Sequence, residues 1–279
     1  MNRFGVYSVQ QLRQAGWTAE RLQGARSSGR LHHVRRGFYA EPWAARDAVR
    51  AVRLGGRLTG ISALPLLGLW QPPDARLHVV VPRNAARLRD PDRRFDPLLD
   101  RADVHVHWQE PSRAKERLPG FEPVAEPLTV VLHAIECCVD EFAVAVLDSA
   151  LHTRLLVAAD LARIRAELPR HRRGLLDLVD GRAEAGGESV VRYRLHLAGY
   201  RVDVQVRIRG VGRVDLLVEG RLVLEIDGRQ FHDGADAFAE DRRRDLALSA
   251  QHLGHLRLTY CQIFDDWPAC LAGIAAALD

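Results

Sequence analysis

Three acidic residues, Asp215, Glu225 and Asp227, have the types and the spacing to do chemistry. They lie in two segments rich in branched residues, 213–218 and 221–227, and the Glu-Gly pair between these segments predicts a β-hairpin. Residues two apart on a strand share a face, so Glu225 and Asp227 point the same way, and pairing across the turn brings Asp215 beside them. Two carboxylates about 4 Å apart repel by roughly 4 kcal/mol at an effective dielectric near 20, so the cluster predicts a protonated acid or a bound cation. Mg²⁺, which takes oxygen ligands, fits such a cluster.

A structural alternative is open for the same acids. They can lie at strand ends, solvated or paired with some of the many arginines, which supply all but one of the 40 basic residues. Flanking residues favour chemistry instead, since Glu188 lies in the first turn of a predicted helix and His232 follows five residues after the last acid. A histidine there can exchange protons near neutral pH. A further predicted helix, over 239–248, presents Arg242 and Arg244, whose guanidinium groups are donors for phosphate oxygens.

The order and spacing of these residues resemble a small endonuclease-like domain of unknown function that is related to very-short-patch-repair endonucleases. That domain belongs to the restriction-endonuclease-like PD-(D/E)xK superfamily, and the resemblance covers about residues 183–279. The matching elements, in chain order, are Glu188, Asp215, Glu225-Ile226-Asp227-Gly228, His232 and Asp241-x-x-Arg244-Asp245-x-x-Leu248.

The resemblance implies a fold and a set of roles. The fold is a mixed sheet flanked by helices. Asp215, Glu225 and the backbone carbonyl of Ile226 would bind Mg²⁺ or Mn²⁺. Asp227 and His232 would take the positions of two active-site histidines of the repair enzymes. The catalytic candidates are therefore Glu188, Asp215, Glu225, Asp227 and His232.

Asp227 departs from the pattern of the wider fold, in which the second strand often ends as acid-x-Lys. The chain has a single lysine, Lys115, far upstream of the cluster. Water activated by a metal ion would then supply the nucleophile, with His232 or a second ion acting on the leaving oxygen. Because an acid cannot neutralise phosphate charge as a lysine does, an inactive domain that only binds nucleic acid is the alternative.

Residues 4–42 have the pattern helix, helix, basic wing. Ser8 with a glutamine three residues later predicts a capped helix, Thr18 caps a second one, and the segment 30–39 predicts two short strands around a glycine-containing turn. This pattern resembles the winged-helix N-terminal domain of AbiEi-type antitoxins, and the matching wing is Val34-Arg35-Arg36-Gly37-Phe38-Tyr39. If the second helix lies in a DNA major groove, the candidate contact residues are Arg21, Arg26, Arg30, Arg35 and Arg36. The alternative is a small packing domain whose arginines serve solubility.

The middle of the chain carries weaker signals. The segments 77–82 and 103–108 are predicted strands, and helical spacing over 128–168 predicts a pair or trio of packed helices. His105 and His107 alternate onto one face of the second strand, but no third ligand follows at a telling spacing, so we expect ordinary packed or surface histidines. The cysteines, which are Cys137, Cys138, Cys261 and Cys270, include no CxxC pair and predict neither a zinc site nor a disulfide framework.

These signals together predict an α/β chain of three parts. A winged-helix domain covers 1–42, an α+β middle region covers 43–180, and a restriction-endonuclease-like mixed sheet flanked by helices covers 181–279. A net charge of +4 on 279 residues is small, so local patches must provide any affinity for DNA. The cysteine usage fits a reducing cytoplasm, and the lack of an apolar run of ~20 residues or of a signal-peptide core argues against a membrane partner.

Two functions are compatible with this organisation. The first is a metal-dependent DNA endonuclease, docked on DNA by the winged helix, in repair, restriction or mobile-element defence. The second is a DNA-binding transcriptional regulator of the AbiEi-type antitoxin class with an inactive nuclease-like domain. An anionic cluster facing phosphate would weaken binding by a regulator that holds no metal, which favours the endonuclease. No organic cofactor is expected, and the sequence gives no support for a cognate toxin or a homodimer.

Overall fold

The computed structural model describes residues 2–109, 121–227 and 235–279. The chain is mixed α/β, with 45% helix and 21% strand, which confirms the class predicted from the sequence. It divides into two compact units, Met1–Cys137 and Cys138–Asp279, which we describe separately. In the described part of the chain, no helix has the length and apolar character needed to cross a membrane.

The first unit begins with two short helices and a small antiparallel sheet. Its elements are β1 (Val6–Ser8), α1 (Val9–Gln14), α2 (Ala19–Ser27), β2 (His32–Arg35) and β3 (Phe38–Ala40), with strand order β1-β3-β2. Ser8 caps α1 as predicted, because its hydroxyl accepts from the backbone N–H of Gln11 while the Gln11 side chain accepts from the Ser8 N–H. Thr18 likewise accepts from the N–H of Arg21 at the start of α2. Gly37, with φ 84°, makes the turn between β2 and β3.

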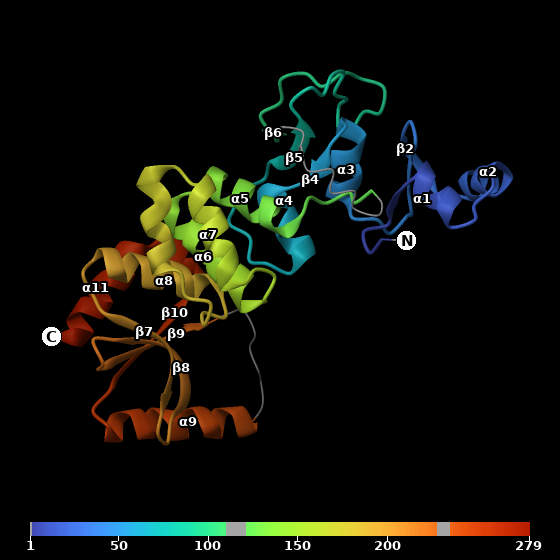
Figure 1. Ribbon diagram of the computed structural model, residues 1–279. Helices are drawn as coiled ribbons and strands as arrows, with labels where there is room; N and C mark the ends of the chain where they lie inside the picture. The colour runs from blue at the N-terminus through green and yellow to red at the C-terminus, as the bar shows by residue number, and fades with distance from the viewer. Residues whose placement is uncertain (1, 110–120, 228–234) are drawn as a thin grey trace. The chain divides into compact units, whose positions relative to one another are not determined.

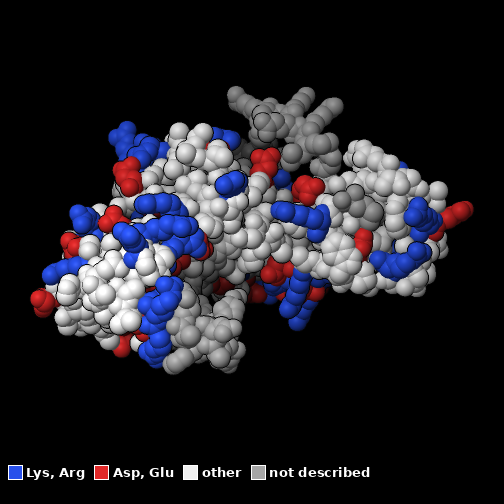
Figure 2. All heavy atoms as spheres, turned by 90° about the horizontal axis from the view of Figure 1, so that it is seen from below, with Lys and Arg blue, Asp and Glu red and all other residues white. Residues whose placement is uncertain are grey.

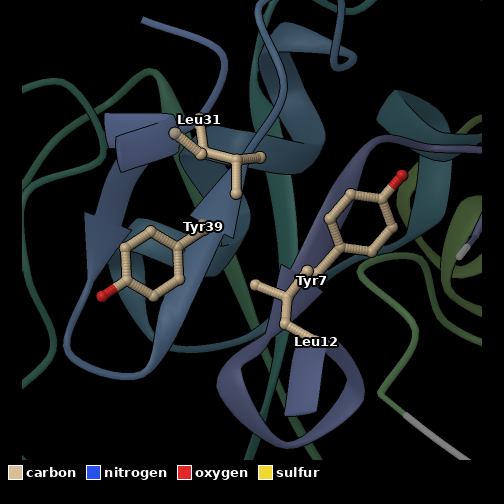
Figure 3. Close-up of a cluster of buried hydrophobic side chains, with 5 residues drawn as sticks. Tyr7, Leu12, Leu31 and Tyr39 are labelled. Carbon is tan, nitrogen blue, oxygen red and sulfur yellow. The ribbon is translucent and has the colours of Figure 1, made fainter. Parts of the chain in front are cut away.

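A compact apolar cluster holds these elements together (Figure 3). Tyr7 and Tyr39 lie directly opposite each other on β1 and β3, and Leu12, Ala25 and Leu31 join them from α1, α2 and the segment that follows α2. Burial of these side chains is the main contribution that stabilises this small group of two helices and three strands. The cluster fixes α2 against the sheet and so sets which of its arginines face solvent.

The rest of the first unit is an α+β arrangement. Its elements are α3 (Arg46–Leu54), β4 (Arg57–Leu58), α4 (Gly60–Ala63), a 3₁₀ turn (Pro65–Leu67), β5 (Leu77–Pro82), β6 (Val104–Gln109) and α5 (Pro127–Cys137). The strand order is β4-β5-β6, with β4 antiparallel to β5 and β5 parallel to β6. The two predicted strands are confirmed. Their parallel register pairs His78 with His105, a contact that sequence spacing does not indicate.

The second unit joins a helical layer to a mixed four-stranded sheet. Its elements are α6 (Asp140–His152), α7 (Ala158–Glu167), a 3₁₀ segment (Arg170–Leu178), α8 (Gly186–Leu197), β7 (Val202–Ile208), β8 (Gly212–Val218), β9 (Leu222–Asp227), α9 (Ala235–Ala250), β10 (Gly254–Thr259), α10 (Tyr260–Asp265) and α11 (Trp267–Leu278). The strand order is β10-β9-β8-β7, in which only β9 and β10 are parallel. Three helices, α5, α6 and α7, account for the helical spacing predicted over 128–168.

Helices lie on both sides of the four-stranded sheet, with α9 on one side and α8 and α11 on the other (Figure 1). On the α9 side, Leu248 packs against Val214 and Val223 of the central strands. On the other side, α8 is fixed to α6 by a buried ion pair, in which Arg192 donates to Asp148 at 2.7 Å. This attachment holds the first turn of α8, which carries Glu188, in a set position.

Candidate active site

Asp215 and Glu225 meet at the end of the β8–β9 ladder. The paired residues of the ladder end at Leu216 and Leu224, so Asp215 lies one step further, beside Glu225, as the hairpin predicted. There the Asp215 carboxylate accepts the backbone N–H of Ile226 at 2.9 Å. The side chain thus takes a donor from the neighbouring strand, which fixes its oxygens at this point of the sheet.

Glu188 of α8 and Gln205 of β7 complete the cluster. The Gln205 amide nitrogen donates to Glu188 at 2.9 Å and lies 3.5 Å from Asp215 Oδ1, so one amide joins the two carboxylates. Glu188 also accepts from the backbone N–H groups of Glu184 and Ala185, which caps α8. A carboxylate with both sets of contacts serves the helix and the cluster at once.

Gln205 was not predicted as a site residue. Its only sequence signal is a polar side chain between Val204 and Val206 in an apolar strand. Its backbone has φ 54°, a left-handed conformation that costs an L-residue roughly 1–2 kcal/mol. Strain of this kind concentrates at functional positions.

The second polar atom of Gln205 stands out. Its side-chain oxygen, Oε1, is buried and has no hydrogen-bond partner among the described residues. An unmade hydrogen bond of a buried polar atom costs about 1–3 kcal/mol. Carboxylate and amide oxygens are hard donors of the kind that Mg²⁺ or Mn²⁺ prefers, but the amide nitrogen of Gln205, not Oε1, faces the two carboxylates, so Oε1 would join them only after the amide group rotates.

Both carboxyl groups of the cluster resist ionisation. Burial raises the pKa of Glu188, and the charge of Asp215 raises it further, while the hydrogen bonds from Gln205 and the backbone oppose the rise. Burial likewise raises the pKa of Asp215, and Glu225 adds to this effect against the N–H of Ile226. A cation would reverse the direction of both shifts by favouring the charged forms.

Glu225 differs from the other two acids because cations surround it. Arg244 of α9 contacts it at 2.5 Å, Arg257 of β10 at 3.1 Å and His255 of β10 at 3.3 Å. For this residue the geometry matches the structural alternative, an acid paired with arginines. Arg244, predicted as a DNA contact, therefore lies inside the carboxylate cluster.

Of the remaining predicted site residues of the second unit, Ile226 contacts the cluster through its backbone, and the others lie apart from it or outside the described residues. Asp227 is exposed at the end of β9, opposite Thr259 of β10. The Ile226 side chain is buried, and its N–H is the donor to Asp215. His232 lies outside the described residues. Arg242 is exposed and pairs with Asp245 at 3.3 Å.

The arginines of the N-terminal region fall into two groups. Those with exposed side chains are Arg21, Arg26, Arg30 and Arg36. Arg21 lies over the Trp17 ring at 4.5 Å. Arg35 is half-buried instead, donates to the carbonyl of Val52 in α3, and has its pKa lowered by burial. On the face drawn in Figure 2, the basic side chains of the described residues form separate groups, with acidic side chains among them.

A second group of chemically active side chains lies in the first unit, and sequence spacing did not indicate it. His78 of β5, His107 of β6 and Cys137 of α5 place one ligand atom each within 4.8 Å of one another. Sequence spacing offers His107 no third ligand, whereas the fold brings His78 and Cys137 to it; that these are ordinary histidines, as the sequence suggested, stays a prediction. The ligands come from three separate elements, so no local spacing could indicate them.

The two clusters offer different chemistry. The second unit presents hard oxygen donors beside guanidinium groups, an arrangement suited to a divalent ion and a phosphate. The first unit presents imidazole and thiol groups, which suit softer metals. No protein-family model matches this chain, and a search of curated proteins found no match.

Proposed function

We propose that this protein is a metal-dependent DNA endonuclease whose active site is the cluster of Glu188, Gln205, Asp215 and Glu225. The observation that carries the proposal is the triad of buried Glu188 with half-buried Gln205 and Asp215, which combines raised carboxyl pKa values, an unpaired amide oxygen and a strained backbone. In a triad with a purely structural role, we would expect ionised carboxylates, a hydrogen-bonded amide oxygen and an unstrained backbone. The mixed sheet between helices supports the restriction-endonuclease-like fold that the sequence resemblance implies.

The donors present fit Mg²⁺ or Mn²⁺. Asp215 and Glu188 would supply carboxylate oxygens, and Gln205 would supply Oε1 once its amide group has rotated to exchange the positions of Nε2 and Oε1. The Ile226 carbonyl and Glu225 are the further ligands expected from the resemblance. A bound ion would supply positive charge at the scissile phosphate and activate water there. The protein's own residues position these groups, since the Ile226 N–H orients Asp215 and the start of α8 orients Glu188.

Arg257 and Arg244 could neutralise phosphate charge in place of the lysine that this chain lacks. The acid-x-Lys position holds Asp227, which cannot neutralise phosphate charge. The guanidinium groups of Arg257 and Arg244 lie at Glu225, in the same part of the site, and can donate two parallel hydrogen bonds to phosphate oxygens. We assign Arg257 the part of the lysine, because it lies on β10 beside the strand that carries Glu225.

One observation favours a second candidate function. The cations around Glu225 already satisfy that carboxylate, as in a site that needs no metal. A DNA-binding transcriptional regulator with an inactive nuclease-like domain would keep such pairs and would use the exposed arginines of the winged-helix region for binding.

Cleavage of supercoiled plasmid distinguishes these functions. The wild-type protein should cut supercoiled plasmid to the open-circular or linear form in Mg²⁺ or Mn²⁺, and EDTA should prevent this cutting. Asp215→Asn should be inactive. Asp203→Asn, which removes an exposed carboxylate from the neighbouring strand β7, is the matched control and should cut like the wild type. Equal cutting by Asp215→Asn and the wild type would reject the assignment. Salt-sensitive duplex binding without any cutting would favour the regulator.

A further inference from the structure

The cluster in the first unit has the spacing of a metal site. His78 Nδ1 and His107 Nε2 lie 3.1 Å apart, and Cys137 Sγ lies 3.9 Å from the same His107 nitrogen. Zn–N bonds of about 2.0–2.1 Å and a Zn–S bond of about 2.3 Å in a tetrahedron give edges of about 3.3 Å between nitrogens and about 3.6 Å between nitrogen and sulfur. The observed separations therefore match, within a few tenths of an ångström, ligands placed around one ion.

The hydrogen bond between His78 Nε2 and Asp74 determines which His78 ring nitrogen carries the proton and which can bind a metal. His78 Nε2 lies 3.2 Å from Asp74 Oδ2, and that carboxylate is itself held by Arg76 at 2.7 Å. A carboxylate that accepts from Nε2–H leaves Nδ1 with its lone pair, aimed at His107. A carboxylate that orients a histidine in this way is the usual outer partner of a zinc ligand.

Three further features of the surroundings are compatible with a metal site. Gly60 has φ 52°, and a Cβ at that position would lie 3.0 Å from His78 Nδ1, so the backbone approaches the imidazole in a way that only glycine allows. His105 Nε2 lies 3.6 Å from Cys137 Sγ, and the His133 ring is stacked on that of His107 with 4.2 Å between centroids, so two further imidazoles lie beside the three ligands. His78 and His107 are buried, at 0% and 7% exposure, so these two ligands are shielded from water, while Cys137 is half-buried.

We propose that the first unit binds one Zn²⁺ through His78 Nδ1, His107 Nε2 and Cys137 Sγ, as a structural ion that ties β5, β6 and α5 together. Two imidazoles and a thiolate suit zinc and exclude Mg²⁺, which prefers oxygen. This site is independent of the carboxylate cluster and of the proposed nuclease activity. It adds a structural metal to the region between the winged helix and the second unit.

The test uses the full chain without a histidine tag, freed of metal with a chelator and titrated with Co²⁺ or Zn²⁺. We expect one equivalent of Co²⁺ to give a thiolate-to-cobalt charge-transfer band that Zn²⁺ abolishes. Cys137→Ser should lose this band, while Cys138→Ser, the matched control at the adjacent residue, should keep it. Asp215→Asn should also keep it, which separates this ion from that of the proposed active site.

A second measurement needs no variant. Zn²⁺ should protect Cys137 from alkylation in the wild-type protein and leave the reactivity of Cys138 unchanged, as read from the alkylated peptides by mass spectrometry. The proposal is overturned if the wild type gives no charge-transfer band, if the band persists in a folded Cys137→Ser protein, or if Zn²⁺ does not slow alkylation of Cys137.

Discussion

Asp215→Asn should stabilise the metal-free second unit while abolishing cleavage. The Gln205 amide nitrogen lies 2.9 Å from an oxygen of Glu188 and 3.5 Å from one of Asp215, so the charged oxygens approach within about 6.4 Å, where an effective dielectric near 20 gives a repulsion of roughly 2.6 kcal/mol. Solvent at the half-buried Asp215 reduces this repulsion. We expect the free energy of unfolding to rise by about 1–2 kcal/mol at about pH 8.

The effect should depend on pH in one direction. The pKa values of both carboxyl groups are raised in the folded protein, so the contribution of these two groups to stability is fully present below their unfolded values, about 3.9 for Asp and 4.3 for Glu, and is lost as pH rises through the folded values. The difference between Asp215→Asn and the wild type should therefore be largest at alkaline pH and vanish near pH 4. Asp203→Asn should change stability by less than about 0.5 kcal/mol at every pH.

Hydrogen exchange measured by mass spectrometry is the suitable assay, because the two units of the chain need not unfold together. Peptides from β8 and β9 report on the opening of the second unit alone. Mg²⁺ at about 100 times its Kd should slow exchange in the wild type by an amount equal to about 2.7 kcal/mol and should have no effect on Asp215→Asn. The reasoning fails if the variant is less stable than the wild type at pH 8, or if their difference does not shrink toward pH 4.

Three further outcomes follow from the same geometry. Glu188→Gln removes the same repulsion as Asp215→Asn but also replaces one of two accepting oxygens by an amide nitrogen, so the two effects offset and stability should change by less than about 1 kcal/mol. Cleavage should fall by on the order of 10²-fold or more, and cleavage at the wild-type rate would remove Glu188 from the site. Arg257→Ala should lower kcat by about 10²–10³-fold and Arg257→Lys should restore much of it, whereas a change in KM alone would indicate substrate binding only. Arg36→Ala should reduce the slope of log K against log salt for duplex binding by about one, as measured in binding titrations at several salt concentrations. Arg35→Ala should leave that slope unchanged and lower the free energy of unfolding, because its side chain donates to the Val52 carbonyl.

The parts of the site that the sequence predicted are those set by local geometry. A two-residue turn between apolar segments determines which residues lie opposite each other, so the pairing of Asp215 with Glu225 follows from the hairpin alone. The capped helices of the N-terminal region were predicted for the same reason, since each cap involves residues three apart.

The parts that escaped prediction depend on contacts between distant elements. Gln205 enters the cluster through a left-handed backbone, which no propensity scale indicates for glutamine. The guanidinium group of Arg257 reaches Glu225 because β10 returns parallel to β9 after a helix. The histidine and cysteine cluster needs β5 beside β6 in register, with α5 over them, and a sequence of this length allows many other pairings.

The buried pair of Arg192 and Asp148 determines where the second unit can be separated from the rest. A fragment that begins at residue 181 would keep Arg192 but lose Asp148, and a buried charge without its partner costs about 3–5 kcal/mol. It would also lose Glu141, which holds Arg194 at 2.7 Å. The four-stranded sheet therefore needs the α6 helix as part of its own folding unit, and an isolated domain suited to activity measurements begins near residue 138.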